Sequence, residues 1–190
     1  YSNIGTFEFL LDDDDPDFFA FMEANPRLQV EHTVTEEVTG IDLVQTQLQI
    51  AAGATLADMG LDDPSVRDPR GHAIQLRVNM ETMMPDGSTR PAGGVLAAFD
   101  PPGGPGVRVD TFGYAGYRTS PAFDSLLAKV IVHAPGRDYG RAVQRAYQAL
   151  CAFRIEGVAS NIGFLQNLLR DDDVIANRVH TRFVDDHVAR

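Results

Sequence analysis

A short stretch near the start of the chain, MEANPRLQVEH, carries a polar side chain at every second position. Side chains of an extended chain alternate between two faces, so we expect these polar groups in one row. The row holds two carboxylates, two amides and one guanidinium, from Glu23, Asn25, Arg27, Gln29 and Glu31. Mg²⁺ and Mn²⁺ prefer such oxygen ligands, and the planar arginine fork suits bicarbonate, carboxylate or phosphate. Because a carboxylate beside a bound anion can act as a general base, the row has the groups of a nucleotide-dependent active site.

A second carboxylate is expected to face this row. Residues 5–11 and 18–25 are aromatic-rich strand candidates, separated by the turn composition DDDDPD. An antiparallel hairpin centred on Asp15–Pro16 would pair Glu8 with Glu23. Two like charges paired across a ladder repel each other unless a cation lies between them. The sequence therefore predicts a metal site at these glutamates, with an ordinary exposed polar face as the alternative.

The remaining patterns predict an α+β chain with a boundary near residues 55–70. A capping-box pattern at Thr33–Glu36 predicts the start of a helix that ends at Gly40. A second helix is expected over residues 41–52, followed by Gly53 as the C′ residue. Further along, we expect alternating and buried strands over 72–81 and 126–133, Gly- and Pro-rich hairpins of a sandwich or barrel over 84–118, and amphipathic helices over 138–153 and 160–170.

The bulk composition narrows the class of protein. The chain has 190 residues, 44% of them hydrophobic, which is enough for one large or two small domains. A formal net charge of −11 argues against a nucleic-acid or anionic membrane partner, because both require a basic face. Cys151 is the single cysteine, so no internal disulfide forms, and no apolar run approaches the ~18 residues of a membrane span. We therefore expect a cytoplasmic protein.

Several segments of the chain resemble the biotin carboxylases, which form the first component of acyl-CoA- and pyruvate-type biotin-dependent carboxylases. They are GTFEFL, FMEANPRLQVEHTVTEEVTGIDLVQTQLQIAAG, RGHAIQLRVNME, GPGVRVDTFGYAGYRTSPAFDSLLAKVIVH and FRIEGVASNIGFLQNLL. The E-x-N pattern is shared by general ATP-grasp enzymes, whereas the continuation R-x-Q-V-E-H is much narrower. The resemblance implies the C-terminal part of an ATP-grasp domain over residues 1–58. It also implies a β-rich biotin carboxylase C-terminal domain with packed helices over residues 70–190.

The resemblance implies a ligase that uses ATP with Mg²⁺ or Mn²⁺. In the family, ATP phosphorylates bicarbonate to carboxyphosphate, this breaks down to CO₂ and phosphate, and N1′ of biotin is carboxylated. Glu8 and Glu23 would ligate the metal that bridges the ATP phosphates, with help from Asn25. Leu10 shares the strand parity of Glu8 and matches a family contact to adenine.

The same resemblance assigns the acid–base and substrate residues. Arg27, Gln29 and the backbone of Val30 would hold bicarbonate. Glu31 matches the general base that deprotonates bicarbonate for attack on the γ-phosphate. Arg77 matches the arginine that stabilises the developing enolate oxygen of biotin, a role in which a fixed cation is worth several kcal/mol.

The resemblance also implies partners. Biotin would arrive as a substrate carried on a biotin carboxyl carrier domain, and a carboxyltransferase domain would pass the carboxyl group to its final acceptor. Both domains are expected outside this segment, on the same longer chain or on another, and the parent protein is expected to be a homo-oligomer. The family's glycine-rich phosphate loop, ATP-binding lysines and lid precede the matching region, so we expect the isolated 190 residues to be inactive.

Two other functions compete with this interpretation. One is a non-catalytic dimerisation or docking module derived from a carboxylase, which would have no physical reason to keep the polar row together with Arg77. The other is a different bicarbonate-using ATP-grasp ligase, such as a carbamoyl-phosphate-forming enzyme, which would leave the similarity of the C-terminal region unexplained. The five histidines have no paired spacing for zinc, and we expect Asp12–Asp15 to form a solvated turn. Asp124 and Lys129 lie in family-like sequence without an assignable role.

Overall fold

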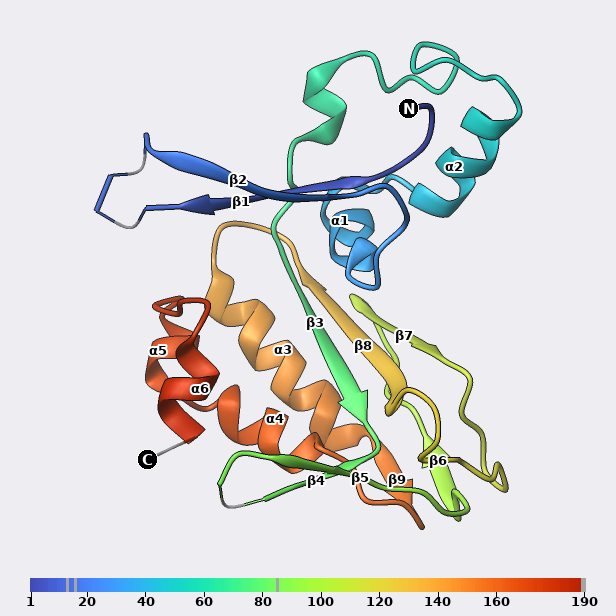
Figure 1. The fold of residues 1–190 in the computed structure, drawn as a ribbon, viewed down its shortest axis with the longest axis vertical. Coiled ribbons are helices and arrows are strands. Elements are labelled where there is room, and N and C mark those ends of the chain that lie inside the picture. Colours follow the sequence, from blue (N-terminus) through green and yellow to red (C-terminus); the bar gives the residue numbers. More distant parts are fainter. Residues whose placement is uncertain (13, 16, 85, 189–190) are drawn as a thin grey trace. The chain divides into compact units, whose positions relative to one another are not determined.

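The computed structural model describes residues 1–12, 14–15, 17–84 and 86–188. The chain divides into two compact units, residues 1–69 and residues 70–190, each with its own strands and helices (Figure 1). No helix among the described residues is long and apolar enough to cross a bilayer.

A two-stranded antiparallel ribbon opens the first unit, with β1 (Thr6–Leu11) paired to β2 (Phe19–Asn25). The register places Glu8 directly opposite Glu23, so the predicted pairing of these glutamates is confirmed. The predicted centre of the turn, Asp15–Pro16, lies partly outside the described residues. The predicted register therefore holds from Thr6 to Glu8, but it is wrong by one residue in the pairs nearer the turn, from Phe9 to Leu11.

A bulge after Glu8 changes the pairing along the rest of the ribbon, so that Phe9 faces Phe21. The Phe9 ring makes edge-to-face contacts with Phe19 and Phe21, at centroid distances of 5.7 and 5.8 Å. Such aromatic pairs stabilise the ribbon beyond the area that they bury. Because side chains alternate along β1, these rings lie on the face opposite to Glu8. The ribbon has one aromatic face and one face that carries the carboxylates.

The polar row predicted beyond Asn25 is wrong as an extended strand. β2 ends at Asn25, and the backbone N–H of Arg27 donates to the Asn25 carbonyl at 2.8 Å, which closes a turn around Pro26. Proline cannot donate to a ladder, so a strand rarely continues through it. Residues 26–31 form a turn that leads into α1 (His32–Thr39).

The predicted capping box at the start of α1 is also wrong. Glu31 already has helical backbone angles (φ −81°, ψ −2°) and occupies the N-cap position, so the helix begins before Thr33. The Thr33 side chain is fully buried inside the helix, where burial and not capping determines its place. The predicted end is confirmed, because Gly40 adopts the left-handed conformation (φ 77°) that glycine tolerates best.

The second predicted helix is confirmed as α2 (Leu43–Ala51). The Asp42 side chain caps it by accepting a hydrogen bond from the backbone N–H of Gln45 at 2.7 Å. Gly53 follows the helix end with φ 95°, as expected of a C′ glycine. One short 3₁₀ helix, η1 (Pro64–Arg67), lies in the irregular segment that completes this unit.

Three antiparallel strands form the main sheet of the second unit, in the order β3–β8–β7 (Figure 1). Their bounds are β3 (His72–Asn79), β8 (Leu126–Ala134) and β7 (Val107–Thr111). The amphipathic helix expected over 138–153 is confirmed as α3 (Tyr139–Ala152) and packs against β8 and β3. The helix and these two strands share one core of buried side chains, which includes Leu76, Val78, Val130, Val132, Val143, Ala146 and Leu150.

Short elements complete the second unit. The second predicted helix of this unit is confirmed as α4 (Ile162–Leu168). Among the described residues, the sandwich or barrel expected over residues 84–118 does not form. β7 joins the main sheet instead, and the three-residue strands of this region form separate two-stranded ladders, which are too short to enclose a barrel. The remaining elements are β4 (Glu81–Met83), β5 (Thr89–Pro91), β6 (Ala98–Asp100), β9 (Arg154–Glu156), α5 (Asp172–Ile175) and α6 (Phe183–Val188).

Candidate active site

Four of the residues predicted to form the site are linked by hydrogen bonds in the first unit. The Asn25 amide nitrogen donates to Glu8 Oε1 at 3.0 Å and to Glu23 Oε1 at 2.7 Å. Gln29 Nε2 donates to the same Glu8 oxygen at 3.2 Å. The end of β2 and the following turn thereby converge on the carboxylate of β1. The turn replaces the predicted extended row but still brings these side chains together.

The chemistry of this cluster fits a hard divalent cation. The two carboxylates face each other across the ladder. The Asn25 amide nitrogen lies between them and donates one hydrogen bond to each. Mg²⁺ sites commonly use one or two protein carboxylates together with substrate phosphates and water. Among the described residues, no group of three or more Asp, Glu, His or Cys side chains is placed to hold a metal. The cluster therefore suits a metal that arrives with a phosphate ligand, with the Asn25 amide reversed to offer its oxygen.

A pocket of about 350 Å³ lies in the same unit and is lined by three of the predicted substrate and acid–base residues, Arg27, Gln29 and Glu31. Arg27 is exposed, and its Nη1 atom lies 3.5 Å from the Leu28 carbonyl, at the limit of a hydrogen bond. Gln29 Oε1 is buried without a hydrogen-bond donor. A buried acceptor without a donor is costly, so it indicates a position where a ligand or water proton would be favourable.

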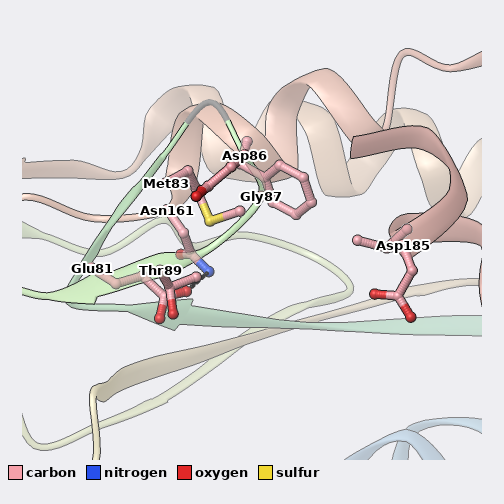
Figure 2. A pocket seen from close by; sticks show the side chains of 9 residues that line it. Glu81, Met83, Asp86, Gly87, Thr89, Asn161 and Asp185 are labelled. Atoms are coloured by element: carbon pink, nitrogen blue, oxygen red, sulfur yellow. Dashed lines mark hydrogen bonds between the residues drawn. The ribbon is translucent and has the colours of Figure 1, made fainter. Parts of the chain in front are cut away.

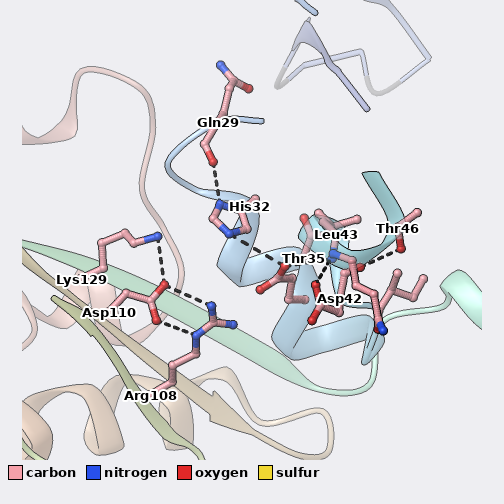
Figure 3. Close-up of polar contacts among 12 residues, drawn as sticks. Gln29, His32, Thr35, Asp42, Leu43, Thr46, Arg108, Asp110 and Lys129 are labelled. Atoms are coloured by element: carbon pink, nitrogen blue, oxygen red, sulfur yellow. Dashed lines mark hydrogen bonds and ion pairs between the residues drawn. The ribbon is translucent and has the colours of Figure 1, made fainter. Parts of the chain in front are cut away.

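His32 also lines this pocket, although no sequence pattern predicts a role for it. Its Nδ1 atom lies 2.8 Å from the Gln29 carbonyl oxygen, and Nε2 lies 3.8 Å from Glu36 Oε1 (Figure 3). Glu36 Oε1 in turn accepts a hydrogen bond from the backbone N–H of Leu43 at 2.9 Å. His32 thus ties the turn that carries Gln29 to the helices behind it. The only feature of the sequence that could have indicated a role for His32 is its position directly after Glu31.

The remaining predicted residues have different positions. Leu10 lies on the same face of β1 as Glu8 and is half exposed, and Val30 belongs to the turn before α1. Arg77 belongs to the second unit, where it is exposed on β3. Its backbone carbonyl accepts a hydrogen bond from Asn161 Nδ2 at 3.1 Å.

Two charged neighbours extend the row that begins at Arg77. In the β3–β8–β7 sheet, Arg77 pairs with Lys129, and Lys129 pairs with Asp110. Lys129 Nζ lies 3.2 Å from Asp110 Oδ2, and Arg108 donates hydrogen bonds to both oxygens of the same carboxylate (Figure 3). Burial raises the pKa of Asp110, but the hydrogen bonds and charges of Arg108 and Lys129 outweigh it and hold that pKa below its usual value. Asp110 is therefore ionised at neutral pH.

A second cavity, of about 370 Å³, lies within the second unit, and Glu81 and Asn161 line it (Figure 2). The Glu81 carboxylate is buried and accepts hydrogen bonds from Asn161 Nδ2 at 3.2 Å and from Asn79 Nδ2 at 3.3 Å. Asn161 Oδ1 accepts the backbone N–H of Asn79 at 2.9 Å. These hydrogen bonds connect the start of α4 to the end of β3, and they therefore hold the strand that carries Arg77 in place.

The sequence of this chain is similar to the sequences of known carboxylases. The sequence model of the family named biotin carboxylase C-terminal domain matches residues 75–186. The sequence model of the carbamoyl-phosphate synthase L chain ATP-binding domain matches residues 1–59. Human mitochondrial pyruvate carboxylase is 44% identical over 188 residues, which cover 98% of this chain and 15% of that protein. The chain therefore belongs to the biotin carboxylase family.

Solved structures agree with the fold described above. A single-chain, multi-domain long-chain acyl-CoA carboxylase has a TM-score of 0.92 at 48% identity, over 98% of this chain and 20% of that chain. The biotin carboxylase domain of 2-oxoglutarate carboxylase from Hydrogenobacter thermophilus, a dimer in complex with MgADP, ADP and bicarbonate, has a TM-score of 0.86 at 37% identity. The match covers 98% of this chain and 39% of that one. The chain thus spans well under half the length of these relatives.

Proposed function

We propose that this chain is the metal- and bicarbonate-binding part of a biotin carboxylase, which uses ATP to carboxylate biotin N1′ through carboxyphosphate. Residues 1–58 would be the C-terminal part of the ATP-grasp domain, and residues 70–190 the biotin carboxylase C-terminal domain. The observation that carries the proposal is the linked cluster of Glu8, Glu23, Asn25 and Gln29, in the unit whose pocket is lined by Arg27, Gln29 and Glu31. The relative from Hydrogenobacter, solved with MgADP and bicarbonate, supports the same assignment.

Each residue has a role that follows from its chemistry. The Arg27 fork and the Gln29 amide would hold bicarbonate, because guanidinium and amide groups match its planar oxygens. Glu31 would accept the bicarbonate proton as the oxygen attacks the γ-phosphorus of ATP, and ADP would leave. Mg²⁺, when bound by Glu8, Glu23 and Asn25, would neutralise phosphate charge.

Arg77 would act in the second step. After carboxyphosphate releases CO₂ and phosphate, N1′ of biotin would give its proton to that phosphate, negative charge would develop on the ureido oxygen, and N1′ would attack CO₂ to form carboxybiotin. A guanidinium fixed beside that oxygen stabilises the charge without having to reorganise. The adenine contact assigned to Leu10 and the backbone contact assigned to Val30 complete the proposed set.

The proposal includes partners that lie outside this segment. Biotin would be carried on a biotin carboxyl carrier domain, and a carboxyltransferase domain would select the acceptor. Relatives named for pyruvate, long-chain acyl-CoA and 2-oxoglutarate support this division of labour, since one type of biotin carboxylase serves different acceptors. The dimer from Hydrogenobacter supports a homo-oligomeric parent protein.

A chimera tests the proposal. This chain would replace the matching segment of the long-chain acyl-CoA carboxylase, to which it is 48% identical, and bicarbonate-dependent ATP cleavage would be measured with and without free biotin. We expect biotin to stimulate turnover, and Glu31→Gln to lower it by a factor on the order of 10²–10⁴, as for loss of a general base. Arg77→Ala should abolish the stimulation by biotin.

The other outcomes identify the competing functions. Robust turnover that biotin does not stimulate would point to a different bicarbonate-using ATP-grasp ligase. A folded chimera without turnover, beside an active unsubstituted carboxylase, would favour the docking module.

A further inference from the structure

Three charged side chains form a straight row across the main sheet of the second unit. The register aligns Arg77 of β3 with Lys129 of β8, and Lys129 with Asp110 of β7. Val78 and Val130, their neighbours in the sequence, are fully buried, so the row lies on the face away from the core. Directly paired side chains have Cβ atoms about 5 Å apart. Two cations are therefore neighbours, with one carboxylate beyond them.

The position of the Lys129 ammonium is set by this carboxylate. Its Nζ atom lies 3.2 Å from Asp110 Oδ2, and only 12% of the Lys129 side chain is exposed. Because β8 is the central strand, this contact draws the ammonium towards β7 and away from β3. Like charges that face each other across a ladder destabilise it, so this direction also relieves repulsion between Lys129 and Arg77.

Arg108 fixes the carboxylate itself. Its Nε atom donates to Asp110 Oδ1 at 2.8 Å and Nη2 donates to Oδ2 at 3.1 Å, in a fork that restricts the carboxylate to one orientation (Figure 3). Arg108 and Asp110 are two residues apart on one strand, so their side chains share a face. The anchor for Lys129 is thus part of the sheet.

We propose that Lys129 and Asp110 together are positioning residues for Arg77. The inference rests on the proposed function, in which Arg77 stabilises charge on biotin. Without the Asp110 carboxylate, the ammonium is no longer drawn to β7, and it repels the guanidinium. Without the Lys129 ammonium, the carboxylate two strands away, about 10 Å between backbones, attracts the long Arg77 side chain across the sheet.

This arrangement predicts an unusual pattern of mutant effects. Asp110→Asn and Lys129→Met should each lower kcat/KM for free biotin about tenfold in the chimera, since small displacements of a positioned group have effects of this size or larger. The double variant carries neither the repelling ammonium nor the attracting carboxylate. It should therefore lie within about threefold of the unsubstituted chimera, and Lys129→Arg should retain most of the activity. KM for ATP should stay unchanged throughout.

A matched control exists on α5, where Asp173 accepts hydrogen bonds from Arg178 Nε and Nη2 at 2.9 and 2.6 Å. Asp173→Asn removes an exposed ion pair away from the sheet face and should leave biotin kinetics unchanged. Single variants as active as the unsubstituted chimera would overturn the inference. A double variant as impaired as the product of the two singles would do so as well, because it would indicate a merely structural role. Biotin stimulation that survives Arg77→Ala would instead remove the role of Arg77, and the proposed second step with it.

Discussion

Replacing Asn161 by alanine tests the connection between α4 and the strand that carries Arg77. The Asn161 side chain makes three hydrogen bonds, to the Arg77 carbonyl, the Glu81 carboxylate and the Asn79 N–H. Asn161 is 6% exposed, so water cannot readily replace these partners. The alanine variant loses all three bonds and leaves a buried carboxylate with one amide fewer.

The expected loss of stability is large for a single substitution. A typical hydrogen bond contributes about 1 kcal/mol net, and burying a group without its partner adds on the order of 1 kcal/mol more. Asn161→Ala should therefore lower the free energy of unfolding by about 3–4 kcal/mol, a substantial part of the 5–15 kcal/mol of a typical domain. The backbone N–H of Asn161 still donates to the Asn79 carbonyl at 3.1 Å, so the variant should remain folded.

Urea unfolding followed by tyrosine fluorescence measures this effect. The chain has no tryptophan, and four of its five tyrosines, Tyr114, Tyr117, Tyr139 and Tyr147, lie in the second unit. Asn167→Ala on the exposed side of α4 is the matched control and should change stability by less than about 0.5 kcal/mol. A loss below about 1 kcal/mol for Asn161→Ala would refute the reasoning, because it would mean that these three bonds do not hold the end of β3.

Three further outcomes follow from particular contacts. The Asp110 carboxylate has a lowered pKa in the folded state, so its stabilisation is complete above its unfolded pKa of about 3.9 and is lost as the pH falls through the folded value. Asp110→Asn should consequently flatten the dependence of unfolding free energy on pH below about pH 4, measured by urea titrations at several pH values. Glu23→Gln removes a repulsion across the ribbon, so without Mg²⁺ it should stabilise the chain by roughly 0.2–1 kcal/mol. In the proposed parent enzyme, the same variant should weaken the stabilisation that we expect from bound MgATP. Thermal unfolding with and without MgATP separates the two effects. Gly157→Ala should be destabilising by about 2 kcal/mol or more, because φ is 91° and a Cβ would overlap the Val95 carbonyl oxygen, whereas Gly103→Ala, with open space around it, should be nearly neutral in the same urea assay.

Local patterns in the sequence predicted the elements whose formation depends on nearby residues. The pairing of Glu8 with Glu23, both glycine helix ends and helix α3 follow from alternation, turn composition and helical periodicity. The bulge after Glu8 could not be predicted, because an extra residue in one strand leaves the alternation of apolar side chains locally ambiguous. The capping-box pattern did not predict the start of α1, because Thr33 is buried within the helix and Glu31 occupies the N-cap position.

Contacts between distant strands were invisible in the sequence. Asn161 lies 82 residues from Asn79, and no spacing rule connects them. The row of Arg77, Lys129 and Asp110 likewise depends on the order and register of three strands. Family resemblance indicated Arg77, but only the sheet topology assigns Lys129 a neighbour on each side.

Residues 23–31 do not form one extended strand, and the turn that replaces it brings the polar side chains of the site closer together. Strand residues rise about 3.3 Å each, so a strand from Glu23 to Glu31 would spread the polar groups over roughly 26 Å. A single bicarbonate and a metal-bound phosphate occupy a much smaller space, and most of such a row would lie out of reach. The turn at Pro26 instead folds the chain back, which places Gln29 Nε2 3.2 Å from Glu8 Oε1 and lets Arg27 and Glu31 line one pocket. Pro26, which ends the strand without breaking the polar alternation of the sequence, is thus what allows these polar residues to converge on one centre.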